Sequence, residues 1–282
     1  NHIVYGNLAI LCGMNGERKE KLDLLKYALK LKPNYPEAHN NLGNHQRQEG
    51  NFDAAICSYQ KAITLKPNYP EAYFNLGSIY QQKGNIDKAI DSYQKAINIK
   101  PNYPEAYYDL GNIYQQKCNI NAAINSYQQA IKLKPNSAET YNNLGNAYNE
   151  KGDTKNSIFS FRQAINLKPN FSEAHNNLAN AFLEKGNFKE AISYFQQALN
   201  LNHNYPDAHY NLGRAFQKIG NINAAISSYQ QAINLKSSYI QAYCGLGSIF
   251  LEKGDLSNAI SYYKQALILK PDYENAHFCL GY

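Results

Sequence analysis

The chain has 282 residues and a formal net charge of +6, from 28 basic and 22 acidic residues. The basic residues form no dense block, so we expect no nucleic-acid partner. No apolar run approaches the roughly 20 residues that span a bilayer, so we expect no membrane segment either.

The sequence repeats itself every 34 residues. Shifting it by this period superimposes a series of leucines, namely Leu42, Leu76, Leu110, Leu144, Leu178, Leu212, Leu246 and Leu280. A fixed period without insertions is typical of a repeat array, in which each unit completes its core against its neighbours. We therefore expect one solenoid domain over residues 1–282.

The units are predicted in chain order from the phase of the repeat. Residues 2–35 form a degenerate first unit, with Cys12 and Lys21 where an aromatic residue and an alanine belong. Full units follow at 36–69, 70–103, 104–137, 138–171, 172–205, 206–239 and 240–273. Residues 274–282 begin a further unit, so we expect the chain to be a fragment of a longer protein.

Each unit contains two helical patterns, which residues 70–103 show most clearly. Pro70 suits the first position of a helix, and apolar residues then recur at helical spacing up to Tyr80. Gly84 breaks the pattern, as a turn with positive φ requires. A second apolar stripe follows and ends before Pro101. We expect close helix contact at Gly77 and a buried aromatic stripe of Tyr59, Tyr93, Tyr127, Tyr229 and Tyr263.

These residues resemble the tetratricopeptide repeat family. The unit supplies the family's pattern at Tyr73, Leu76-Gly77, Tyr80, Ala89, Tyr93, Ala96 and Pro101. The resemblance implies an all-α, right-handed superhelical solenoid of helix-turn-helix repeats, with the first helix of each unit lining a concave surface.

One position on the first helices is filled mainly by asparagine. Immediately before the Leu-Gly or Leu-Ala pair of the full units stand Asn41, Asn75, Asp109, Asn143, Asn177 and Asn211, after which the series ends at Gly245. Asparagine is a mediocre helix former, but its amide offers donors and acceptors that can pair with the backbone of an extended peptide. We call these six residues the ladder. The alternative is that the amides satisfy neighbouring polar groups, or were copied when the units duplicated.

Neighbouring positions on the same helices supply further candidates. One step before the ladder lie Phe74, Tyr108 and Tyr210, with Asn40, Asn142 and Asn176 at the same position of other units. Three steps after it lie Asn44, Asn112, Asn146, Asn180 and Arg214. The aromatic rings could take apolar side chains of a ligand, and Arg214 could bind a carboxylate. A solvated polar face is the alternative interpretation.

Metal and catalytic sites are not expected. His39, His175, His209 and His277 occupy the position that tyrosine holds in other units, so we interpret them as packing residues. No cysteine and histidine cluster has zinc spacing, and no nucleotide-binding or hydrolase motif occurs. The five cysteines, Cys12, Cys57, Cys118, Cys244 and Cys279, include no CxxC pair. We expect free thiols, and hence a cytoplasmic protein.

The function predicted is a protein-interaction scaffold, without enzymatic activity or cofactor, that holds an extended peptide segment of a partner protein. The ladder and the phrase PNYPEAHNNLGN are similar to those of the O-linked N-acetylglucosamine transferases. That likeness implies an alternative, in which the chain recruits substrates for a glycosyltransferase domain. A second alternative is a structural, self-assembling array, that is, a homo-oligomer.

Overall fold

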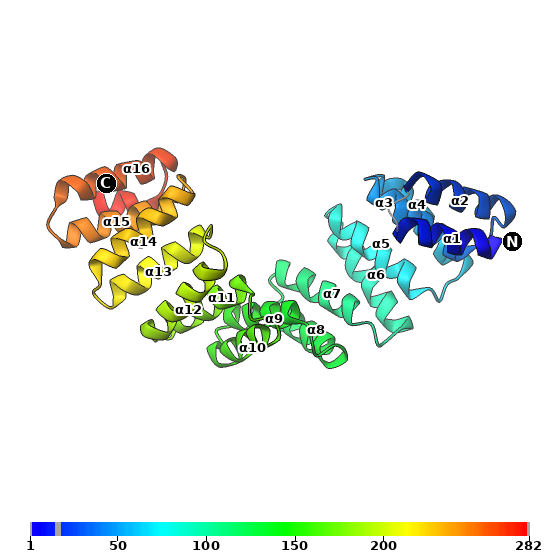
Figure 1. The fold of residues 1–282 in the computed structure, drawn as a ribbon, viewed down its shortest axis with the longest axis horizontal. Coiled ribbons are helices and arrows are strands. Elements are labelled where there is room, and N and C mark those ends of the chain that lie inside the picture. The colour runs from blue at the N-terminus through cyan, green and yellow to red at the C-terminus, as the bar shows by residue number, and fades with distance from the viewer. Residues whose placement is uncertain (1, 15–17, 281–282) are drawn as a thin grey trace. The chain divides into compact units, whose positions relative to one another are not determined.

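A computed structural model of the chain describes residues 2–14 and 18–280. In this part of the chain all regular structure is helical, without a strand, and consecutive helices are joined in pairs by short turns (Figure 1). The all-α helix-turn-helix prediction is therefore confirmed. The seventeen helices are α1 (His2–Met14), α2 (Arg18–Leu31), α3 (Pro36–Gln48), α4 (Phe52–Leu65), α5 (Pro70–Gln82), α6 (Ile86–Ile99), α7 (Pro104–Gln116), α8 (Ile120–Leu133), α9 (Ala138–Glu150), α10 (Thr154–Leu167), α11 (Ser172–Glu184), α12 (Phe188–Leu201), α13 (Pro206–Lys218), α14 (Ile222–Leu235), α15 (Ile240–Glu252), α16 (Leu256–Leu269) and α17 (Glu274–Leu280).

The helices form two compact units, Asn1–Pro135 with α1–α8 and Asn136–Tyr282 with α9–α17. Within each unit the packing is sequential. From α1 to α16, each odd-numbered helix packs against the next helix of its own repeat. Within α1–α8 and within α9–α17, each even-numbered helix that has a following repeat in its unit packs against the first helix of that repeat, as α6 does against α7. One continuous right-handed solenoid over residues 1–282 stays a prediction.

The helix boundaries follow local sequence signals. Pro70 is the first residue of α5, where its missing N–H costs no hydrogen bond. After α5, Gly84 adopts a φ of +73°, and the N–H of Asn85 donates to the carbonyl of Tyr80 at 2.8 Å. Cys118 takes the same position after α7 with a φ of +56°. Cys118 thus replaces the turn glycine of its repeat.

The core of each full repeat is built around one aromatic ring of its second helix. The side chains of the predicted stripe, Tyr59, Tyr93, Tyr127, Tyr229 and Tyr263, are at most 2 % exposed, so this prediction is confirmed. The ring packs against the glycine of the Leu-Gly pair. A Cβ atom at Gly77 would lie 2.9 Å from the ring of Tyr93, which is closer than such contacts allow. The glycine thus sets how near the two helices of a repeat can approach.

Lysines at the ends of the second helices pair with glutamates at the starts of the first. Lys66 Nζ lies 3.1 Å from Glu37 Oε1, and Lys168 Nζ lies 3.0 Å from Glu139 Oε1. Lys66 also lies 4.5 Å from the centre of the Tyr69 ring. Exposed ion pairs contribute at most about 1 kcal/mol each. The pairs therefore tie together the two ends of a repeat without dominating its stability.

Candidate functional site

All six ladder residues lie at the same position of a first helix, and all six are half-buried. Asn41, Asn75 and Asp109 belong to α3, α5 and α7 of the first compact unit. The second unit holds the others on α9, α11 and α13, namely Asn143, Asn177 and Asn211. Their partial exposure leaves one side of each side chain open to a ligand.

Two ladder amides bind a buried asparagine of the preceding repeat. Asn75 Nδ2 donates to Asn40 Oδ1 at 3.0 Å, and Asn177 Nδ2 donates to Asn142 Oδ1 at 3.1 Å. The acceptors are 5 % and 1 % exposed, so this position faces the repeat interface in these units. Part of the ladder therefore satisfies neighbouring polar groups, as the alternative interpretation proposed. Each amide still has an N–H and a lone pair that these bonds do not use.

The aromatic candidates, one step before the ladder, pack against core rings. Phe74 lies 5.5 Å from the ring centre of Tyr93 and 5.0 Å from that of Tyr103. Similar contacts join Tyr108 to Tyr127 at 6.1 Å, and Tyr210 to Tyr229 and Tyr239 at 5.7 and 5.2 Å. All three side chains are half-buried. Each ring thus uses one side for packing, and contact of the other side with a ligand stays a prediction.

The four asparagines that lie three steps after the ladder divide into two groups. Asn44 accepts a hydrogen bond from the hydroxyl of Tyr59 at 2.7 Å, and Asn112 accepts one from Tyr127 at 2.8 Å. In the repeats of Asn146 and Asn180 the core ring is a phenylalanine, Phe161 or Phe195, which has no hydroxyl to donate. Within the described part of the chain, the side chains of Asn146 and Asn180 make no hydrogen bond. These two amides are the most available ones.

Asp109 is the ladder's only acidic member. Burial raises its pKa to about 6, and the nearby carboxylate of Glu105 acts in the same direction, while a hydrogen bond from the hydroxyl of Tyr93 opposes them. Thirty-five residues earlier stands Phe74, where Asn40 and Asn142 provide polar partners to other ladder residues. Among the described residues no lysine or arginine forms an ion pair with Asp109. Its charge is therefore uncompensated at neutral pH.

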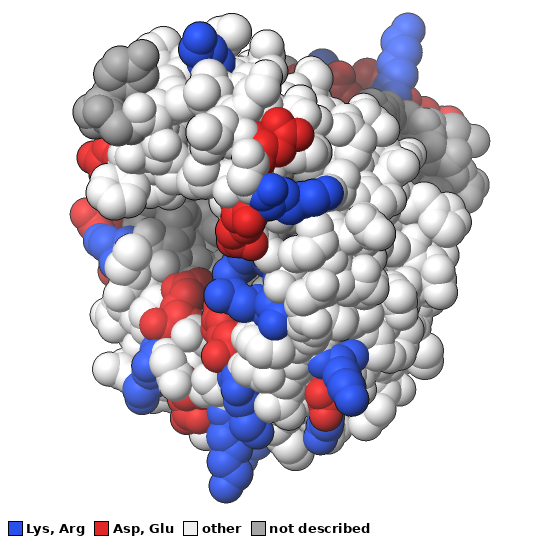
Figure 2. Space-filling view, turned by 90° about the vertical axis from the view of Figure 1, so that its left-hand side faces the viewer, with Lys and Arg blue, Asp and Glu red and all other residues white. Residues whose placement is uncertain are grey.

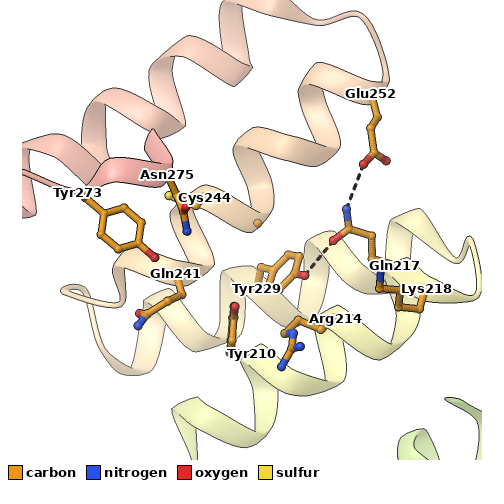
Figure 3. A pocket seen from close by; sticks show the side chains of 11 residues that line it. Tyr210, Arg214, Gln217, Lys218, Tyr229, Gln241, Cys244, Glu252, Tyr273 and Asn275 are labelled. Carbon is orange, nitrogen blue, oxygen red and sulfur yellow. Dashed lines mark hydrogen bonds between the residues drawn. The ribbon is translucent and has the colours of Figure 1, made fainter. Parts of the chain in front are cut away.

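At the other end of the ladder, Arg214 is held by its neighbours on α13. Its Nη1 donates to Asn211 Oδ1 at 3.2 Å, and its guanidinium carbon lies 5.9 Å from the centre of the Tyr210 ring. Together, Tyr210 and Arg214 line a pocket of about 510 Å³ between α13, α14, α15 and the start of α17 (Figure 3). The structure thus brings two of the predicted site residues into one cavity.

The residues that complete this pocket were not predicted from the sequence. They are Gln217, Lys218, Tyr229, Gln241, Cys244, Gly245, Glu252, Tyr273 and Asn275. The signal available was Gly245 itself, since a glycine at the ladder position has no side chain to occupy this space. The sequence interpretation treated Gly245 as the end of the ladder, and the structure shows a cavity there.

The four histidines have a more specific role than packing. The ring Nε2 of His39 lies 2.8 Å from the carbonyl oxygen of Pro33, and His175 and His277 make the same contact with Pro169 and Pro271. Each ring thus fastens the loop that precedes its helix. His209 pairs in this way with the carbonyl of His203, and burial lowers its pKa. No group of three potential metal ligands occurs among the described residues.

Three remaining sequence predictions concern the cysteines, the distribution of charged side chains and possible membrane segments. Cys57, Cys118, Cys244 and Cys279 are free thiols, and the side chain of Cys12 lies outside the described residues. On the face drawn in Figure 2, basic and acidic side chains are interspersed. None of the helices in the described ranges is both long and apolar enough to cross a membrane.

This geometry defines an array of paired helices with a polar ladder on its first helices. The family model described as "TPR repeat" matches residues 43–84, 77–117, 119–152, 145–186, 179–220, 218–254 and 247–282. The chain therefore belongs to the TPR, or tetratricopeptide, repeat family. No curated protein matched the sequence.

Solved structures show the same fold. A MamA protein is 32 % identical over 61 % of this chain and 95 % of its own, with a TM-score of 0.54. YrrB, titled a TPR protein with an unusual peptide-binding site, is 21 % identical over 69 % of this chain and all of its own, with a TM-score of 0.56. The APC/C Cut9–Hcn1 structure matches 94 % of this chain and 52 % of its own at 19 % identity, with a TM-score of 0.66.

Proposed function

We propose that the chain is a protein-interaction scaffold that binds an extended segment of a partner protein along its first helices. The observation that carries this proposal is the ladder of half-buried polar side chains, spaced by one repeat, in which Asn75 and Asn177 each keep an N–H and a lone pair that their bonds to the preceding repeat do not use. An extended peptide presents alternating C=O and N–H groups, and an amide can pair with both at once. Because such contacts hold the backbone, they tolerate different side chains.

The amides divide between structural and ligand-binding roles. Asn75 and Asn177 tie adjacent repeats together and so keep their amides in a defined orientation. Asn146 and Asn180, which have no hydrogen bond within the described structure, lose none when a ligand binds. Because two of these amides are already oriented and the other two have no hydrogen bond to break, the cost of ordering side chains when a ligand binds is lower. YrrB, described as a TPR protein with an unusual peptide-binding site, shows that the fold itself is compatible with this function.

A finer version of the proposal is that the bound segments are substrates of a glycosyltransferase similar to the O-linked N-acetylglucosamine transferases. It rests on the ladder and on the phrase PNYPEAHNNLGN, and it assigns no catalytic residue to this chain. It predicts that Rossmann-type βα units occur in the same polypeptide as this array. A parent protein without such units would contradict it and leave the scaffold proposal intact.

The test uses the full chain and an array of random-sequence 12-residue peptides with blocked ends. We expect the wild type to bind a subset of them, and the double variant N146A/N180A to lose several-fold in affinity for that subset. The triple variant N143A/N177A/N211A should lose at least as much with little change in helical circular dichroism. Unchanged binding in both variants would show that the ladder face is not the binding site.

The matched control is N44A, which removes an amide that accepts from a core tyrosine. It should reduce thermal stability more than peptide affinity. Light scattering across a concentration series separates the proposal from a self-assembling array, because only the latter requires a mass that rises with concentration.

A further inference from the structure

The pocket beside Gly245 exists because two small residues replace larger ones. Gly245 stands where other repeats carry an asparagine or aspartate, and Cys244 stands where Tyr108 and Tyr210 stand in their repeats. The ring of Tyr229 lies against the backbone of Gly245, since a Cβ atom there would lie 2.8 Å from its Cζ, so a larger residue at this position would meet the ring. The remaining space is the cavity of about 510 Å³.

Several polar groups that line this pocket have no partner within the described structure. They are the hydroxyls of Tyr210 and Tyr273 and the amides of Gln241 and Asn275, for which the described residues make no hydrogen bond. Figure 3 shows Tyr273, Gln241 and Asn275 on one side of the pocket and Tyr210 and Arg214 on the other. All of these groups can donate a hydrogen bond. The pocket is therefore rich in donors from more than one direction.

The charges around the pocket favour an anion. Arg214 is exposed and forms no ion pair among the described residues, although Asn211 and the ring of Tyr210 hold its guanidinium in place. Glu252 is the one carboxylate among the lining residues, and it accepts from Gln217 Nε2 at 3.3 Å. Gln217 in turn accepts from Tyr229 at 3.0 Å. The acidic group is thus already engaged, while the arginine is oriented and available.

We propose that this pocket binds the side-chain carboxylate of an aspartate or glutamate within the extended partner segment. The inference rests on the proposed function and adds a side-chain preference to it. An arginine can bind a carboxylate through two parallel hydrogen bonds, which are stronger than bonds between neutral groups. The hydroxyls of Tyr210 and Tyr273 supply further donors, and the rings accommodate the aliphatic part of the side chain.

The probe is a fluorescein-labelled peptide of alternating alanine and glutamine with one central glutamate, acetylated and amidated so that the glutamate carries its only charge besides the dye. Its counterpart has glutamine at that position, and a third peptide has phosphoserine. By fluorescence anisotropy with the full chain, we expect the glutamate peptide to bind about tenfold more tightly than the glutamine peptide. Equal affinities would overturn the proposal, and a clear preference for phosphoserine over glutamate would replace the carboxylate by a phosphate.

Variants test whether the preference for the glutamate peptide over the glutamine peptide arises in the pocket. R214Q should abolish the difference between the two peptides, whereas R162Q, which makes the same charge change on α10, should preserve it. A preference that survives in R214Q would overturn the proposal. C244Y fills the pocket with the residue that Tyr108 and Tyr210 place at this position, and it should abolish the preference without unfolding the chain.

An independent measurement does not require peptide binding. The thiol of Cys244 lines the pocket, so its alkylation, followed by mass spectrometry at each cysteine, reports occupancy. N-acetylglutamate amide at millimolar concentration should slow alkylation of Cys244 more than its glutamine analogue does, and should leave the exposed Cys57 unaffected. If neither peptide binds but this protection is seen, the scaffold proposal fails and the pocket stands. Equal protection by both compounds would overturn the pocket.

Discussion

Replacing Asp109 by asparagine should stabilise the protein at neutral pH, because it restores the residue that the other five ladder positions carry. Burial raises the pKa of Asp109 from 3.8 to about 6. A difference of this size corresponds to about 3 kcal/mol. The native state binds the proton of Asp109 more tightly than the unfolded chain does. The protonated carboxyl therefore contributes its full stabilisation of the native state below pH 3.8, and this contribution is lost as the pH rises through about 6. At neutral pH the wild type therefore holds a half-buried, uncompensated carboxylate.

The assay is urea unfolding of D109N and wild type between pH 3.5 and pH 8, compared as the difference in unfolding free energy at each pH. Other carboxyl groups titrate in both proteins and cancel in this difference. We expect a value near zero at the acid end and about 2–3 kcal/mol in favour of D109N above pH 7. The hydroxyl of Tyr93 donates to Gln81 Oε1 at 2.9 Å, and the substitution at position 109 leaves that hydrogen bond in place.

The control is a variant whose difference in unfolding free energy from the wild type changes with pH in the opposite direction. Hydrogen bonds donated by Asn156 lower the pKa of Asp153, which caps α10. D153N should therefore lose stability relative to wild type at neutral pH, and the loss should shrink as the pH falls. A D109N difference that is flat with pH, or that shares the sign of D153N, would refute the electrostatic reasoning for Asp109.

Three further substitutions test the backbone and the core. C118G should raise stability by about 1 kcal/mol in thermal unfolding, because Cys118 has a φ of +56° that glycine adopts without strain; G84A at the equivalent turn should lower it, and equal effects would contradict the turn assignment. A130L should lower stability by about 1–3 kcal/mol through overpacking, because Ala130 is 3 % exposed between helices; an unchanged unfolding midpoint would contradict the packing assignment.

The fold could be predicted because each structural requirement recurs at a fixed position. A glycine at the turn, an aromatic ring on the second helix and a glycine opposite it appear in phase along the chain, so one unit explains the others. Even an exception was informative, since Cys118 keeps the conformation of the glycine it replaces. Local geometry decides these features, and local geometry repeats with the sequence.

The site was predictable only in part, because its hydrogen bonds join positions 35 residues apart. Asn75 and Asn177 occupy the same position of their repeats as Asn41 and Asn211 do. The residues of the neighbouring repeat decide which partner each amide contacts. Phe74 occupies the position from which Asn40 and Asn142 accept a hydrogen bond in other repeats, and the ladder residue of the next repeat is the acidic Asp109. The pocket at Gly245 likewise depends on side chains of three consecutive repeats. Reading one position along the chain does not show these combinations.

The availability of an amide follows from the identity of the core ring beside it. Tyr59 and Tyr127 direct their hydroxyls at Asn44 and Asn112, so these amides serve the fold. A change from tyrosine to phenylalanine in the core removes that donor and frees the amide, as at Asn146 and Asn180. Substituting Phe161 by tyrosine should therefore engage Asn146 and weaken peptide binding from inside the core. The binding capacity of this ladder is thus set as much by buried rings as by the asparagines themselves.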